Sequence, residues 1–182
     1  MTDVWAQQLE AWHDFYVILG SAAAGLTGLM FVVVSLTSTS MVQRTATGVR
    51  VFLSPSVVFF TSIVLVAAVM AIPPLPPVVL GAVLIAGGGA GVAYLLGIRG
   101  HRQWRQSGLD RLDWLWYVAL PLASYAAMAA GGAAMVDGAR FALHVVGAAA
   151  IALLVIGIRN AWDLVLWMTR QPTRTESPES PP

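Results

Sequence analysis

The sequence contains no cysteine and no lysine, and it has little charge of either sign. Without cysteine, the chain can form no disulfide, thiolate nucleophile, thioether-linked haem or cysteine zinc site. Charged residues make up 10% of the chain and hydrophobic residues 58%, whereas soluble domains average about 25% and about 45–50%. A surface that faces water needs far more charge than this. The composition therefore predicts an integral membrane protein.

The same absences limit what chemistry the protein could perform. A Ser–Lys dyad is excluded because there is no lysine, the apolar runs hold no pair of carboxylates, and no HExxH zinc motif is present. A haem bound by His144 would need an axial partner that the other apolar runs do not supply. We therefore expect no enzyme activity and no cofactor. A net charge of +1, with the basic residues divided among several loops, also predicts no nucleic-acid partner.

Five apolar runs are long enough to cross a bilayer, which takes about 20 residues in a helix. They cover approximately residues 15–39, 51–72, 78–98, 114–136 and 141–158, and the last run can be extended to 168. These runs predict an all-α membrane bundle of five transmembrane helices, which forms one domain over residues 1–170. In the second run, Ser54 and Pro55 suit an N-cap and a first helical position, so the regular helix is expected to begin there.

The arginines predict the orientation of this bundle. Nine of the ten lie in the segments that follow the first, third and fifth runs, and only Arg140 lies in a segment on the opposite side. Since loops rich in arginine stay in the cytoplasm, the N-terminus is expected outside and the C-terminus inside a bacterial cytoplasmic membrane. The tail, residues 171–182, holds four prolines and few apolar residues, so it is predicted to be a disordered cytoplasmic segment.

The N-terminal segment carries three acidic and no basic residues before Phe15, which is unlike a cleavable signal peptide. Trp5, Leu9, Trp12 and Tyr16 recur at helical spacing. This spacing predicts a helix that lies along the outer interface on one apolar face.

Small residues at intervals of four predict faces where helices approach closely. The candidates are Gly20, Ala24 and Gly28 in the first run, and Gly87 and Gly91 in the third. In lipid, such positions let backbones come into van der Waals contact. The alternative is that the glycines of the third run soften that helix or expose its backbone to a permeating species.

Arg159, Asn160 and Asp163 form the most informative local cluster. Arg159 and Asp163 are four residues apart and share a helix face with Asn160. The fifth helix either ends near Ile158, with the rest at the interface, or continues to Met168 and carries the cluster into the bundle. There the three residues would act as a polar latch, or alternatively as a gate or solute contact.

Two further residues within the apolar runs stand out, one as a titratable group and one as the cause of a helix kink. His144 is a titratable group that lies four residues after Arg140, so it is expected near the outer interface. Pro121 leaves the carbonyl of Tyr117 without its usual helical donor, which predicts a kink.

Part of the chain resembles a known family. The residues Trp12-His13-Asp14-Phe15-Tyr16, the small-residue run that follows to Leu36, and the segment from Arg159 to Trp167 are similar to a group of uncharacterised small bacterial polytopic membrane proteins. Some members of that group are labelled as modulators of an FtsH-type membrane protease. The resemblance covers about a fifth of the chain and implies a non-enzymatic polytopic protein, without supplying site residues.

The loops are short and leave no soluble domain. We therefore expect an accessory or regulatory partner of a larger membrane assembly, which contacts the lipid bilayer, a membrane-protein partner and further copies of itself in a homo-oligomer. The alternative is a homo-oligomeric channel or small-solute transport protein, lined by Ser21, Thr27 and Ser35 or by the Gly87–Gly91 run.

Overall fold

The computed structural model describes residues 2–38, 46–72, 75–99 and 114–169. These residues are helical apart from short turns, with no strand among them, so the expected all-α class is confirmed. The elements are α1 (Thr2–Ser38), α2 (Ala46–Met70), α3 (Pro77–Arg99), the π-helical turn η1 (Leu115–Ala119), α6 (Leu120–Val136) and α7 (Ala142–Thr169). The tail 171–182 and the six arginines from Arg44 to Arg174 that lie in the loops or after residue 169 fall outside the described residues.

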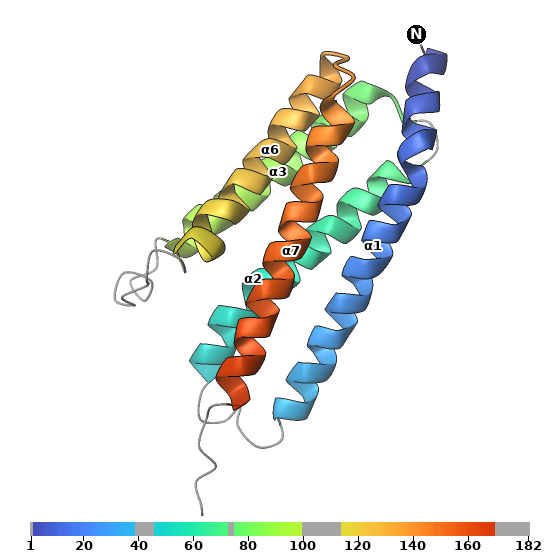
Figure 1. Cartoon of the computed structure of the whole chain (residues 1–182). Coiled ribbons are helices and arrows are strands. Elements are labelled where there is room, and N and C mark those ends of the chain that lie inside the picture. The colour runs from blue at the N-terminus through green and yellow to red at the C-terminus, as the bar shows by residue number, and fades with distance from the viewer. Residues whose placement is uncertain (1, 39–45, 73–74, 100–113, 170–182) are drawn as a thin grey trace, which may run out of the picture.

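The long helices run alternately in opposite directions, so the start of α1 and the end of α7 lie at opposite ends of the bundle (Figure 1). Helix α7 is central, because it packs against α6 on one side and α2 on the other. Helix α3 packs mainly on α6, and α1 mainly on α2, whereas α2 and α3 scarcely touch. The molecule is therefore two helix pairs, α3–α6 and α1–α2, joined through α7.

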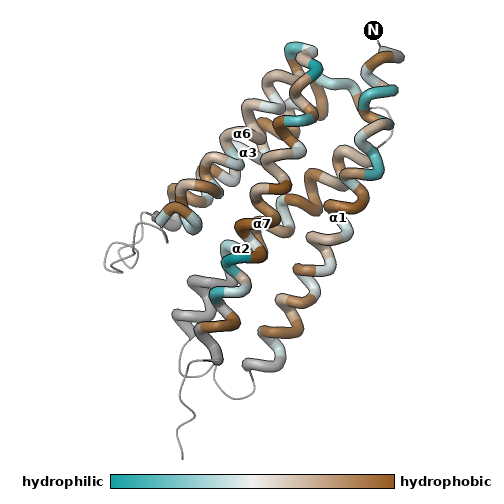
Figure 2. Tube along the Cα trace, viewed as in Figure 1, coloured by the Kyte–Doolittle hydropathy of each residue, from teal (hydrophilic) through white to brown (hydrophobic). Residues whose placement is uncertain are grey.

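Four helical segments are long and apolar enough to cross a membrane. They are Val4–Val33, Pro77–Gly97, Leu115–Val136 and Ala142–Asp163. Figure 2 shows their apolar character along most of the length of the bundle. The apolar stretch identified in α2, Pro55–Met70, is shorter than these segments. A multi-pass membrane protein is thus supported, while the fifth span remains a prediction.

The N-terminal segment continues directly into α1 and is not a separate interfacial helix. Its expected apolar face is turned toward the protein, since Leu9 and Tyr16 are buried and Trp5 and Trp12 are half-buried. The Trp5 indole donates a hydrogen bond to the carbonyl of Leu75, in the turn between α2 and α3, at 3.4 Å. The aromatic face packs on other helices, so no bilayer interface is needed to cover it.

Two helices differ from the sequence expectation at their prolines. Helix α2 begins at Ala46, which places Pro55 inside the helix and not at its start. Near Pro121, the irregularity takes the form of the π-turn η1, in which the Leu120 amide donates to the carbonyl of Leu115. Proline has no N–H for the carbonyl four residues earlier, and the wider turn just before α6 adapts the chain to that loss.

Helix α7 runs without interruption from Ala142 to Thr169. Of the two alternatives for the fifth run, the structure therefore has the long helix, about 42 Å at 1.5 Å per residue. The turn before it is tight: Gly138 has a φ of 74°, and the Ala139 amide donates to the carbonyl of Ala134 at 2.8 Å. A left-handed residue at this position closes the end of α6, and glycine adopts it without steric cost.

Candidate functional site

The candidate site lies near the end of the bundle where α7 finishes, and it is built from α7, η1 and α2. Figure 2 shows hydrophilic colour returning on this part of α7 after a long apolar stretch. We call Arg159, Asn160 and Asp163 the α7 polar cluster. The uninterrupted α7 holds the three residues within about one helical turn.

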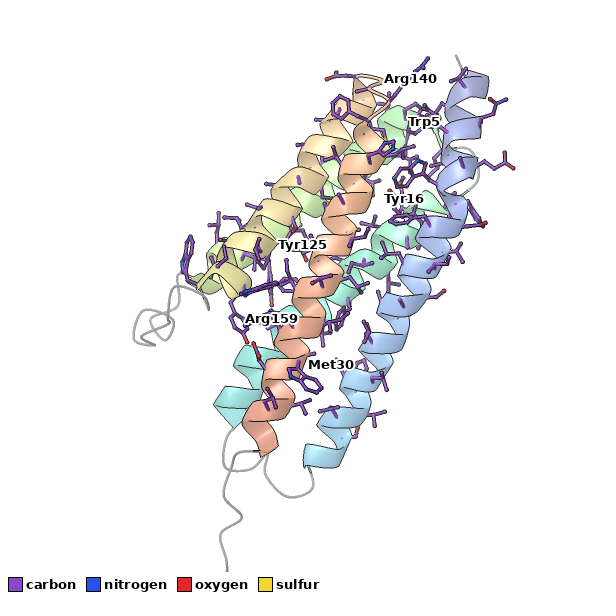
Figure 3. The ribbon with its side chains drawn as sticks, in the orientation of Figure 1. Trp5, Tyr16, Met30, Tyr125, Arg140 and Arg159 are labelled. Atoms are coloured by element: carbon purple, nitrogen blue, oxygen red, sulfur yellow. The ribbon has the colours of Figure 1, made fainter. Side chains whose placement is uncertain are left out.

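Arg159 is exposed and stacks on an aromatic ring. Its guanidinium carbon lies 4.7 Å from the centre of the Trp116 ring, and Figure 3 shows the side chain reaching from α7 toward the start of α6. A guanidinium over an indole face at this distance is a cation–π contact, worth about 0.5–1 kcal/mol at an exposed position.

Asp163 is half-buried and accepts a hydrogen bond from the Tyr117 hydroxyl at 3.1 Å. Trp116 and Tyr117 are therefore consecutive residues of η1 that each contact one charged residue of α7. These contacts connect η1 to the last turns of α7. The sequence alone does not predict this role for either aromatic residue, because tryptophan and tyrosine at a helix start also suit a membrane interface. The available signal was their position at the start of the fourth run, on the same predicted side of the membrane as Arg159 and Asp163.

Asn160 is only 1% exposed, and neither its amide nitrogen nor its carbonyl oxygen has a hydrogen-bond partner among the residues that the structure describes. It extends the buried stripe of α7 that includes Leu153, Ile156 and Gly157. The sequence grouped Asn160 with Arg159 and Asp163, but nothing in its polar neighbours indicated that Asn160 is the one of the three that is buried.

Ser56 of α2 is a second buried polar residue at this end. It is 0% exposed, and its hydroxyl has no partner within the described part of the chain. Four other helical hydroxyls each donate to the carbonyl four residues earlier, with distances of 2.8 or 2.9 Å; these belong to Thr27, Ser35, Ser62 and Ser124. Ser56 was not a sequence candidate, since a single serine in an apolar helix usually forms this local bond.

His144 lies near the opposite end of the bundle and is exposed at the protein surface. Its ring is edge-on to Trp12 of α1, with the ring centres 4.8 Å apart and an interplanar angle of 82°. Gly147 makes room for the same tryptophan, because a Cβ there would lie 2.8 Å from Trp12 Cζ3. In this structure, His144 takes part in the α1–α7 contact and is far from the α7 polar cluster.

The five small-residue candidates divide into two groups. Gly20 packs closely on Ala67 of α2, and Gly91 packs on the ring of Tyr125. Ala24 is exposed, and a Cβ built at Gly28 or Gly87 would have no neighbouring atom within 4 Å. Besides Gly91, the close α3–α6 contact uses Gly81, Gly88 and Gly132, where an added Cβ would come within 2.7 Å of a backbone carbonyl oxygen.

An open pocket of about 650 Å³ lies between the start of α1 and the end of α2. Its polar lining comes from Glu10, His13 and Asp14 of α1. In the described segments, no group of three or more histidine or acidic side chains is arranged to hold a metal ion.

In the α7 polar cluster, one further helical element, η1, supplies an aromatic contact to Arg159 and a hydrogen bond to Asp163. Comparison of the chain with protein-family models, curated proteins and solved structures finds no match. The resemblance carried by the first and last runs therefore remains an expectation.

Proposed function

We propose that the protein is a non-enzymatic, five-span protein of a bacterial cytoplasmic membrane that acts as an accessory or regulatory partner of a larger membrane assembly. Its N-terminus would lie outside and its C-terminus in the cytoplasm. The observation that carries the proposal is the uncovered face of α1. In the apolar stretch of α1, only 28% of the stretch is buried inside the protein, whereas 50% of the apolar stretch of α7 is buried.

The uncovered face of α1 has the composition of a helix-packing surface. Ala24, Gly25 and Gly28 are exposed, and neither glycine has a neighbour within 4 Å of a built Cβ. One turn earlier, Gly20 already packs closely on Ala67. Since membrane helices associate through small residues that let backbones approach, this face is suited to a helix of another subunit.

The hydroxyl groups of α1 support an accessory role over a channel. Thr27 and Ser35 each donate to a carbonyl of their own helix. A hydroxyl that is bonded in this way keeps its oxygen lone pairs, but its O–H is already used and does not donate to a permeating anion or polar solute.

The absence of cysteine makes this proposal directly testable, because single cysteines can be introduced without a background. In spheroplasts, a membrane-impermeant maleimide should label Asp137→Cys, in the α6–α7 turn, and should label Ser180→Cys only after the membrane is opened. The reverse pattern would overturn the orientation.

The role itself is tested in native membranes and in liposomes. We expect Gly28→Cys to form a crosslink to a protein of different mass in native membranes, while Gly89→Cys, an exposed position on α3, serves as the matched control. Purified protein in liposomes should produce no ion or solute flux above that of empty vesicles. Flux that a bulky residue at Gly28 or Gly87 abolishes would overturn the accessory role in favour of the channel. A crosslinked product of twice the chain mass alone would identify the partner as a second copy.

A further inference from the structure

Ser56 and Asn160 lie at the same level of the α2–α7 interface. The register is given by Phe60 and Gly157, since a Cβ at Gly157 would lie 2.5 Å from Phe60 Cε1. The two helices are antiparallel (Figure 1). Ser56 is four residues before Phe60 and Asn160 is three residues after Gly157, so both are about one turn, 4.5–6 Å, toward the same end.

Three polar atoms are therefore left without partners at one level of the α2–α7 interface. They are the Ser56 hydroxyl and both polar atoms of the Asn160 amide, judged against the residues that the structure describes. A group of this kind is costly to bury, and a surrounding bilayer provides no water at depth to satisfy it. A molecule that hydrogen-bonds to both side chains removes that cost.

The chemistry of the three atoms selects the occupant. A cation would be held by the Asn160 oxygen and the Ser56 hydroxyl, but it would be repelled by the amide N–H groups. An anion would satisfy the N–H groups and be repelled by the amide oxygen. An uncharged molecule with a donor and an acceptor side by side satisfies all three atoms. The nearby charges of Arg159 and Asp163 sum to zero, which gives no preference for an ion.

The position is closed toward the middle of the bundle. Phe59, Phe60 and Leu153, all fully buried, lie on that side of the two polar residues. Since Asn160 is itself 1% exposed, only a small molecule can reach it. This arrangement favours binding over passage through the protein.

We infer that Ser56 and Asn160 form a binding site for a small uncharged molecule that carries adjacent hydrogen-bond donor and acceptor groups. Two sources share this chemistry: solvent water and a small amide solute. The inference does not rest on the proposed function, because it requires neither a partner at α1 nor any particular role in the cell.

The first test compares Ser56→Ala, Asn160→Leu and the double variant in the full-length purified protein. If one molecule bridges the two side chains, each single change lowers Tm by about 2–4 °C, and the double variant loses less than the sum of the two. Ser124→Ala, which removes a buried hydroxyl bonded to its own helix, is the matched control and should be additive with Asn160→Leu. If the site is dry, each single change raises Tm, because an unsatisfied polar group is replaced by an apolar one. That outcome would overturn the inference.

The second test identifies the source of the occupant. Ser56→Cys is nearly isosteric, and Ala150→Cys is the control, since Ala150 is also 0% exposed but lies in the apolar middle of α7. Methyl methanethiosulfonate should modify the cysteine at 56 about tenfold faster, because polar surroundings and access support the reactive thiolate. Protection by acetamide assigns the site to an amide solute, and an unchanged rate assigns it to water. Equal rates at 56 and 150 would overturn the inference, whatever the result of the flux and crosslinking experiments.

Discussion

Gly88 in α3 and Gly28 in α1 are the same residue in two apolar helices, but their surroundings differ completely. A Cβ at Gly88 would lie 2.7 Å from the Tyr125 carbonyl oxygen and 2.8 Å from the Ala129 amide nitrogen, whereas a Cβ at Gly28 would meet nothing within 4 Å. The α3–α6 pair is therefore closed by its glycines, and α1 leaves part of its glycine face open. A small-residue stripe indicates that close approach is possible, and only the packing shows where it occurs within the chain.

The largest expected effect comes from filling the closed interface. Gly88→Val should lower the free energy of unfolding by about 3 kcal/mol, near the top of the range for overpacking, because its new atoms meet backbone that cannot move aside. The adjacent variant Gly87→Val, on the open side of α3, should change it by less than about 0.5 kcal/mol. Thermal unfolding of both purified proteins in the same detergent measures the difference. Equal losses would contradict the described α3–α6 contact.

A smaller effect is expected at the link between the α3–α6 pair and α2. The Ser62 hydroxyl donates to the Val58 carbonyl, so the Tyr125 hydroxyl, 2.9 Å away, is left to donate to Ser62. Tyr125→Phe should therefore cost about 1 kcal/mol of unfolding free energy. In a double-mutant cycle with Ser62→Ala, the two losses should not add, and full additivity would show that the two hydroxyls do not interact.

Trp116→Leu tests the contact between η1 and α7. Loss of the cation–π contact with Arg159 should cost about 0.5–1 kcal/mol, measured as before by thermal unfolding. Trp162→Leu is the matched control, because Trp162 is 63% exposed. If the two substitutions have the same effect on unfolding free energy, the contact between the Trp116 ring and Arg159 does not stabilise the protein.

The smallest effect on stability is expected on the open face. Gly28→Val should change the unfolding free energy by less than about 0.5 kcal/mol, since nothing in the chain is displaced. The same substitution should abolish the native-membrane crosslink of a cysteine placed at Gly25. If Gly28→Val instead lowers stability and leaves the crosslink intact, then Gly28 does not lie on an open face of α1 that binds a partner.

Apolar run length was the reliable part of the sequence analysis. It predicted the helical class and located the described helices to within a few residues, apart from the beginnings of α1 and α2 and the end of α7, for which the sequence allows residue 158 or residue 168. Those two starts were missed for one reason: Trp5 and Leu9 suit an interface as well as a protein contact, and Pro55 suits a helix start as well as a helix interior. The local preferences of these residues allow either arrangement, and the packing partners determine which one forms.

The candidate site was predictable only in part. The spacing of Arg159, Asn160 and Asp163 placed them near one another because a helix fixes such distances. Which of the three would be buried depended on the direction in which α7 packs, and the contacts with Trp116 and Tyr117 depended on the π-turn. Neither is encoded in the residues of α7 alone.

The π-turn also determines how the start of this helix is rotated. A π-turn contains one residue more than an α-turn, and one residue corresponds to about 100° around a helix axis. If the same residues formed regular α-helix, the preceding side chains would turn by about that angle relative to α6, whereas deleting one residue within Leu115–Ala119 would convert the turn to α-helix and leave them facing the same way. The alignment of an indole with Arg159 and a phenol with Asp163 thus depends on the length of one turn as well as on the identity of the side chains.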